Sequence, residues 1–225
     1  PNIITTCCPS VNDLIEKYYP ELVPLMAPVV SPMIAHGRLI RQIYGEDVKV
    51  VFLGPCIAKK AEAVGDERVS GAVDAILTFE EVVQWWKMAG IHVSECEDEA
   101  LANPCPMVNQ LYPVGGGIIH SVLAGPGAPR EGQGRYYKVA VDGLNACMEL
   151  FEELKKGEIK NCFFEVNVCE GGCIKGPASD KWNRSVVRAK MDVERHAVKR
   201  GPAEDIAGAN VDMHKTFADR RVEAP

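Results

Sequence analysis

Residues 48–56 read VKVVFLGPC, an almost unbroken apolar and β-branched run that ends at a glycine, a proline and a cysteine. This composition predicts a buried strand over residues 48–53. Two further predicted strands end in the same way: residues 3–6 run into CCP at 7–9, and residues 162–168 run into CEGGC at 169–173. Three strands, each followed at once by cysteine, form the pattern from which the fold and the chemistry of this chain are predicted.

Helical patterns separate these strands along the chain. Ser10 is the expected N-cap of the first helix, and Thr78 with Glu81 has the spacing of a capping box after a short strand. Strands that alternate with helices predict an α/β fold with mainly parallel sheets and flanking helices. The other expected helices lie at 32–44, 79–88, 118–123 and 143–156, and the other expected strands at 73–77 and 138–141.

Length and composition narrow the class of protein. The 225 residues, with 47% hydrophobic and 25% charged residues, are typical of a globular protein of one large domain or two small lobes. The net charge of −6 argues against a nucleic-acid surface, which is normally basic. No apolar run reaches the roughly 18–20 residues that a membrane span needs. The chain opens at Pro1 without an initiator Met or a signal-peptide pattern, and we interpret it as a piece of a longer polypeptide.

Cysteine usage points to metal chemistry. The chain has nine cysteines, an odd number, in a sequence rich enough in helix and strand signals not to need disulfides. A reducing compartment, the cytoplasm, with a thiolate-bound metal or cluster is therefore expected. We expect Cys147, on an apolar helix face, and Cys162, at the start of a strand, to be core residues. Cys96 and Cys105 fall in an irregular acidic stretch and are assigned no function.

Three cysteine sites share one structural context at the carboxyl ends of predicted strands. Ligands collect at that edge of an open α/β sheet, so loops from separate strands can converge there. Four thiolates from such loops suit a [4Fe–4S] cluster, because soft thiolate ligands select iron–sulfur clusters or zinc. An all-cysteine zinc site is the weaker alternative, since structural zinc usually uses two tight Cys-x-x-Cys pairs.

At these residues the chain resembles the active-site domain of [FeFe]-hydrogenases. The segment TTCCP at 5–9 is similar to the first family motif, Thr-Ser-Cys-Cys-Pro. The segment GPCIAKKAE at 54–62 is similar to the second, Met-Pro-Cys-x-x-Lys-x-x-Glu, and CEGGC at 169–173 to the third, Cys-x-Gly-Gly-Cys. The resemblance covers residues 3–177 in family order. It implies two lobes with the cluster site between them, in a domain over 1–180 that lacks the upstream part of the family domain, followed by a charged C-terminal extension or linker over 181–225.

The resemblance also implies a role for each motif residue. Cys7 is expected to remain unligated and to relay protons. Lys59 is expected to donate to a cyanide ligand, and Glu62 to orient Lys59 or the neighbouring backbone. One cysteine is expected to bridge the [4Fe–4S] cubane to a di-iron subsite that carries CO, cyanide and a dithiolate. That cysteine is Cys173, and the cubane ligands are Cys8, Cys56, Cys169 and Cys173.

Some positions depart from the family pattern. The methionine before Pro-Cys is Gly54 here, the methionine two residues before the third motif is Asn167, and the proton-path serine aligns with Ala27. These departures resemble sensory members of the family, and a missing hydroxyl at Ala27 is expected to slow proton delivery. The expected reaction is reversible oxidation of H2 to protons and electrons, at low activity or as part of hydrogen sensing.

Two other classes of function stay open. One is a regulatory module that signals through a partner domain; the other is a relative of the cytosolic iron–sulfur assembly factors, which hold [4Fe–4S] clusters without hydrogen turnover. Cys7 next to Cys8, and Lys59 near Cys56, favour the hydrogenase interpretation. The partners that the resemblance implies are a ferredoxin-like electron-transfer domain or protein, the hydrogenase maturation factors and a signalling domain.

Overall fold

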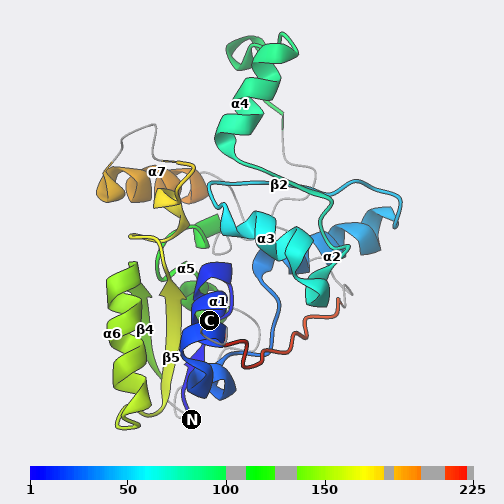
Figure 1. The fold of residues 1–225 in the computed structure, drawn as a ribbon. Coiled ribbons are helices and arrows are strands. Elements are labelled where there is room, and N and C mark those ends of the chain that lie inside the picture. Colours follow the sequence, from blue (N-terminus) through cyan, green and yellow to red (C-terminus); the bar gives the residue numbers. More distant parts are fainter. Residues whose placement is uncertain (100–109, 125–135, 180–184, 199–210, 222–225) are drawn as a thin grey trace.

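The computed structural model describes residues 1–99, 110–124, 136–179, 185–198 and 211–221. It is an α/β structure with two separate parallel sheets and flanking helices, as the sequence predicts (Figure 1). In chain order the strands and the longer helices are β1 (Ile3–Ile4), α1 (Pro9–Tyr18), α2 (Pro32–Tyr44), β2 (Val51–Leu53), α3 (Ala58–Gly65), β3 (Ala75–Leu77), α4 (Phe79–Met88), α5 (Gly117–Ala124), β4 (Tyr137–Asp142), α6 (Leu144–Lys155), β5 (Cys162–Asn167) and α7 (Val186–Val198).

Short 3₁₀ helices connect several of these elements. They are η1 (Pro20–Leu25), η2 (Glu67–Val69), η3 (Val93–Glu95) and η5 (Cys173–Lys175). The expected capping box is confirmed: the Thr78 side chain accepts from the backbone N of Glu81, and the Glu81 carboxylate accepts from the backbone N of Thr78. No helix in the described ranges is long and apolar enough to cross a bilayer.

The first lobe is built on a three-stranded parallel sheet in the order β1-β5-β4. Side chains alternate across a strand, so β5 presents different residues to its two faces. Phe164 and Val166 pack with Cys147 and Phe151 of α6 and with Ile15 of α1 in one buried cluster. On the opposite face of β5, the Glu165 carboxylate accepts hydrogen bonds from backbone N–H groups at the start of α5. The expectation that Cys147 and Cys162 belong to the core is confirmed, because they are 0% and 6% exposed.

The second lobe holds the two-stranded parallel sheet β2-β3, with Val51 opposite Ala75 and Leu53 opposite Leu77. Its core is formed by α2, α3 and the start of β3, including Ile34, Ala63 and Ile76. The prediction of a fully buried strand over 48–53 is wrong: Val51 and Leu53 are 47% and 49% exposed. In a sheet of two strands β2 lacks a second neighbour, and within the described residues only one face of β2 is covered.

The first helix begins two residues earlier than expected. Cys8, not Ser10, is the N-cap of α1, and Pro9 occupies the first helical position. Proline is favoured there because its missing N–H and fixed φ cost nothing at the first position of a helix. The second cysteine of the Cys-Cys pair is therefore held at the N-terminus of α1.

Candidate functional site

All five motif cysteines lie in loops that follow parallel strands. Cys7 and Cys8 follow β1, Cys56 follows β2, and Cys169 and Cys173 follow β5. Each of them is partly buried and free of disulfides. The three motif regions contact one another: Lys59 Nζ, three residues after Cys56, donates to the Cys7 carbonyl oxygen at 3.2 Å, and the Ala178 N–H donates to the Pro55 oxygen at 3.0 Å. The expected meeting of the three cysteine motifs is thus observed.

Burial decides the protonation of this cysteine group. Desolvation is the main reason why the pKa of Cys169 is raised to about 11 and that of Cys173 to about 12. Burial also raises the pKa of Cys56, against the lowering effect of the backbone N–H of Lys59. These thiols therefore keep their protons near neutral pH unless a cation compensates. Metal binding would supply that compensation and release the protons.

The described residues contain no ready-made site for a single metal ion. Among the described residues, no three His, Cys, Asp or Glu side chains lie close enough together to hold one metal ion. A [4Fe–4S] cluster holds each cysteine on its own iron, so its four ligands stand further apart than the ligands of one zinc ion. Thiolates are the usual protein ligands of a [4Fe–4S] cluster, so cysteines such as Cys8, Cys56, Cys169 and Cys173 are chemically suitable donors for one.

A cavity of about 950 Å³ opens beside these cysteines, between the two lobes. Cys7, Cys173 and Lys59 line it, together with Asn167 at the end of β5. The rest of the lining is largely apolar and comes from both lobes and from α7. Its apolar members include Met33, Ile40, Val50, Phe52, Phe79, Ile118, Ile174 and Val193. The cavity thus combines thiols, one buried cation and apolar walls.

Lys59 is held at this cavity by two contacts. Its Nζ donates to Glu62 Oε2 at 2.6 Å and to the Cys7 carbonyl oxygen at 3.2 Å. Glu62 Oε2 also accepts from Ser31 Oγ at 3.1 Å, while Glu62 Oε1 is buried without a hydrogen-bond partner among the described residues. The side chains of Lys59 and Glu62 are 9% and 1% exposed. The expected pairing of Glu62 with Lys59 is therefore present, and Ser31 is a third member that the sequence did not indicate.

The thiol of Cys7 has one hydroxyl beside it. Thr5 Oγ1 lies 3.7 Å from Cys7 Sγ, and Thr5 is 6% exposed. Burial first, and then the charge of Cys8, raises the pKa of Cys7 to about 12. Ala27, where the expected hydroxyl is missing, contributes only its backbone, and its carbonyl accepts from Thr6 Oγ1 at 3.0 Å. Among the described residues, Thr5 thus provides the hydroxyl that contacts the Cys7 thiol.

A buried carboxylate fixes the glycine turn that precedes α5. Glu165 is 0% exposed, and its two oxygens accept the backbone N–H groups of Gly116 and Ile119, both at 2.9 Å. Asn167 Nδ2 donates to the same carboxylate at 3.4 Å. Burial raises the pKa of Glu165 in spite of these hydrogen bonds. Glu165 is the one acidic residue of the apolar 162–168 run, which is the signal in the sequence that could have indicated it, but it belongs to none of the three cysteine motifs.

The third cysteine motif is packed backbone against backbone. Gly172 has φ +91°, and a Cβ there would lie 2.6 Å from the Gly115 nitrogen and 2.7 Å from the Pro113 oxygen. The backbone N–H of Ala178 donates to the Pro55 oxygen at 3.0 Å. The loop at 169–178 is therefore fixed both to the glycine turn and to the loop that carries Cys56.

Comparisons with known proteins show the family and the fold of this chain. Residues 1–177 match the family described as iron only hydrogenase large subunit, C-terminal domain. The fold is similar to solved [FeFe]-hydrogenase structures. One of them is a variant of HydA1 from Chlamydomonas reinhardtii, with a TM-score of 0.69 and 17% identity over 98% of this chain and 77% of the other. The chain therefore belongs to the family of C-terminal domains of iron only hydrogenases.

Two kinds of protein are similar to this chain in sequence, hydrogenases and an iron-sulfur assembly component. The periplasmic [Fe] hydrogenase large subunit of Nitratidesulfovibrio vulgaris is 28% identical over 76% of this chain and 50% of its own length. Iron hydrogenase 1 of Clostridium pasteurianum is 26% identical over 86% of this chain and 40% of its own. The bovine cytosolic iron-sulfur assembly component 3 is 23% identical over 77% of this chain and 46% of its own. The chain thus spans half or less of these relatives.

Proposed function

We propose that this chain is the cluster-binding part of an [FeFe]-hydrogenase that oxidises H2 reversibly to two protons and two electrons. The observation that carries the proposal is the cavity between the lobes, where Cys7, Lys59 and Cys173 line one space of about 950 Å³. A cluster carrier needs the four cysteines but has no need of a cavity with a buried cation beside them.

The four cysteines Cys8, Cys56, Cys169 and Cys173 are proposed to hold the [4Fe–4S] cubane. Cys173 is the member of this set that lines the cavity. This supports the proposal that Cys173 would also hold a di-iron subsite with CO, cyanide and dithiolate ligands. When bound, that group would supply the chemistry of H2 cleavage, and the protein would supply ligation, hydrogen-bond donors and a proton route.

Lys59 and Cys7 are proposed to act on the contents of the cavity. Glu62 orients Lys59, whose compact ammonium has donor capacity left for an anionic ligand such as cyanide. The Cys7 thiol carries a proton near neutral pH, because burial raises its pKa to about 12. Thr5 Oγ1 is the neighbouring hydroxyl with which that proton can be exchanged. The electrons require an acceptor, for which we propose a ferredoxin-like domain or protein.

The departures at Ala27 and Asn167 support a low rate of turnover, as in a hydrogen sensor. Ala27 offers no side-chain hydroxyl, so the proton route from Cys7 has Thr5 as its next member and lacks the hydroxyl that the family places at position 27. We further propose that the chain works in the cytoplasm, is loaded by hydrogenase maturation factors and reports to a signalling domain. Residues 1–180 form the cluster domain in this proposal, and 181–225 the extension.

The second candidate is a [4Fe–4S] protein of the assembly-factor type. Its support is the sequence relationship to the bovine assembly component, which covers 77% of this chain. In that function the cubane ligands keep their role, and the cavity beside Cys173 holds no second metal group.

Infrared spectroscopy separates the two candidates. The protein is produced with the hydrogenase maturation factors, kept anaerobic and placed under H2, and the region of the carbonyl and cyanide stretches is recorded. Bands that shift with H2 are expected. A [4Fe–4S] absorbance without any such bands would overturn the hydrogenase proposal and leave the assembly-type function.

A further inference from the structure

Residues 211–221 lie along the seam between the two lobes (Figure 1, red segment). The segment pairs with the connection between the lobes: the N–H of Val30 donates to the Met213 oxygen at 2.8 Å, and that of Lys215 to the Pro28 oxygen at 3.1 Å. Val29 and His214 form an antiparallel bridge. This part of the C-terminal region is therefore packed on the cluster domain as an added strand-like segment.

In the first lobe the segment is tied to Glu16 of α1. Glu16 is 0% exposed, and its carboxylate accepts from the Ala218 N–H at 3.1 Å and from Arg220 Nη1 at 3.3 Å. The backbone N–H of Arg220 donates to the Glu16 oxygen at 2.8 Å. Burial raises the pKa of Glu16, but these donors and Arg68 lower it more, so the pKa lies below its usual value.

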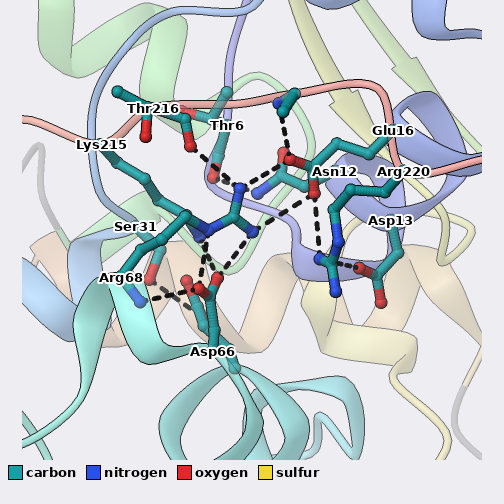
Figure 2. A network of polar contacts seen from close by, with 12 residues as sticks. Thr6, Asn12, Asp13, Glu16, Ser31, Asp66, Arg68, Lys215, Thr216 and Arg220 are labelled. Carbon is teal, nitrogen blue, oxygen red and sulfur yellow. Dashed lines mark hydrogen bonds and ion pairs between the residues drawn. The ribbon is translucent and has the colours of Figure 1, made fainter.

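In the second lobe the segment is tied to Asp66, which caps η2 just after α3. Lys215 Nζ lies 2.7 Å from Asp66 Oδ2, and Lys215 is only 4% exposed. Arg68 joins the two lobes: its guanidinium donates to Asp66 and, at 2.6 Å, to Glu16 Oε1. It also donates to the Thr216 oxygen at 2.9 Å. Figure 2 shows this network, with Arg68 between Glu16 and Asp66.

The two helices fixed by this network carry cluster residues at their other ends. Cys8 is the N-cap of α1, which contains Glu16. Cys56 lies two residues before α3, Lys59 is in its first turn, and the helix ends immediately before Asp66. The connection that pairs with the segment also reaches the site, because Thr6 Oγ1 donates to the Val29 oxygen at 2.8 Å and Ser31 Oγ donates to Glu62.

We propose that residues 211–221 are a clamp that sets the separation of α1 and α3, and thereby controls how tightly the cluster is held between Cys8 and Cys56. The clamp joins both helices at the ends remote from the cluster, and rigid helices carry a displacement along their length. The inference rests on cluster binding as proposed above, and does not require hydrogen turnover.

The contacts of the clamp make its release possible without unfolding. Arg220 and Arg68 are partly exposed, with side chains at 47% and 25%. Ion pairs that reach solvent weaken as salt rises. An anionic partner or high salt can therefore compete for the basic side chains of the segment and loosen the two helices.

The test compares Lys215→Met and Arg220→Met with the control Arg221→Met. Arg221 lies in the same segment but pairs with Asp219 inside it. The full chain is reconstituted with iron and sulfide, and loss of the [4Fe–4S] absorbance to an iron chelator is timed. We expect release to be faster by about fivefold or more in both clamp variants, and unchanged in the control. Raising salt should accelerate release from the unmodified protein more than from Arg220→Met.

Hydrogen exchange of the cluster-free protein provides the second readout. Loss of protection is expected at residues 6–10 and 56–62 in the clamp variants, while β5 stays protected. Arg220→Met is the decisive variant, because its partly exposed side chain can be replaced without opening the core. Release rates and exchange equal to the control in that variant would overturn the clamp. If the unmodified protein takes up no cluster, the proposed function fails, and hydrogen exchange alone decides the clamp.

Discussion

Lys59 Nζ and Glu62 Oε2 are 2.6 Å apart inside a wall of the cavity, three residues apart on α3. The same ammonium donates to the carbonyl oxygen of Cys7, in the other lobe. This pair therefore places a cation between the two lobes, where the loops of the first and second cysteine motifs meet.

Removing one partner of this buried pair should be costly. Glu62→Leu leaves the Lys59 ammonium buried without a counter-charge, and we expect a loss of about 3–5 kcal/mol in the free energy of unfolding of the cluster-free protein. The double variant Lys59→Met/Glu62→Leu should recover part of that loss. Urea unfolding measures both. The control is Lys60→Met, whose pair with Glu81 is 38% and 43% exposed and should cost less than about 1 kcal/mol. Equal costs for Glu62→Leu and Lys60→Met would contradict the prediction.

Gly172→Ala should disrupt the third cysteine motif. The new Cβ meets the Gly115 nitrogen at 2.6 Å, so the backbone of one loop has to move. Gly157 is the matched control, because its φ of +72° is also left-handed but no atom lies within 4 Å of an added Cβ. Gly157→Ala is expected to cost about 1–2 kcal/mol in stability and to leave cluster uptake intact. Gly172→Ala is expected to cost more and to lose the [4Fe–4S] absorbance; normal uptake in that variant would refute the argument.

The clamp should make stability sensitive to acid. Burial opposes ionisation of Asp66 and Glu16, yet their basic partners, chiefly Arg68, hold both pKa values below the usual range. Carboxylates with lowered pKa stabilise the fold above their unfolded pKa of about 4, and that contribution is lost as pH falls through the folded values. The melting temperature should therefore drop below about pH 4, and Asp66→Asn should show a shallower drop. Parallel curves for the two proteins would show that Asp66 does not carry this dependence.

Asn167 should affect the ligands in the cavity. One amide hydrogen is used by Glu165 at 3.4 Å, and this side-chain amide makes no other hydrogen bond within the described ranges. Asn167→Leu removes a donor and an acceptor from the lining at similar volume. In the loaded protein we expect at least one carbonyl or cyanide infrared band to move. Met33→Leu, an apolar change in the same cavity, is the control. If the bands of Asn167→Leu keep the frequencies of the unmodified protein, as those of Met33→Leu are expected to do, Asn167 makes no hydrogen bond to the carbonyl or cyanide ligands.

Glu165→Gln tests how the glycine turn is held. Both oxygens of the carboxylate accept backbone N–H groups, and an amide presents one acceptor and one donor to them. One buried N–H is left unsatisfied, so a loss of about 1–3 kcal/mol is expected by urea unfolding. Glu149→Gln, on the exposed side of α6, should change stability little. A neutral Glu165→Gln would show that the turn at 115–119 is held by other contacts.

Local patterns in the sequence were sufficient for much of the fold. Strand composition, the capping box at Thr78 and the apolar face around Cys147 depend on neighbours a few residues away, and each is observed. Two expectations were wrong, Ser10 as the N-cap of α1 and a buried strand over 48–53, and each was wrong for a different reason. Proline at position 9 competes with serine for the helix start, and the burial of a strand depends on neighbours that are distant in sequence.

By itself, then, the sequence determined that cysteines follow three strands of an α/β fold, because periodicity and chain breaks are local properties. Only the tertiary structure decided what surrounds those cysteines. Thr5 beside Cys7, Ser31 on Glu62 and the buried Glu165 beneath the glycine turn were not assigned from the motifs. The contact between Glu16 and Arg220 joins residues 204 positions apart. Such pairs arise when two lobes and a returning segment close on one another, and no local pattern encodes that closure.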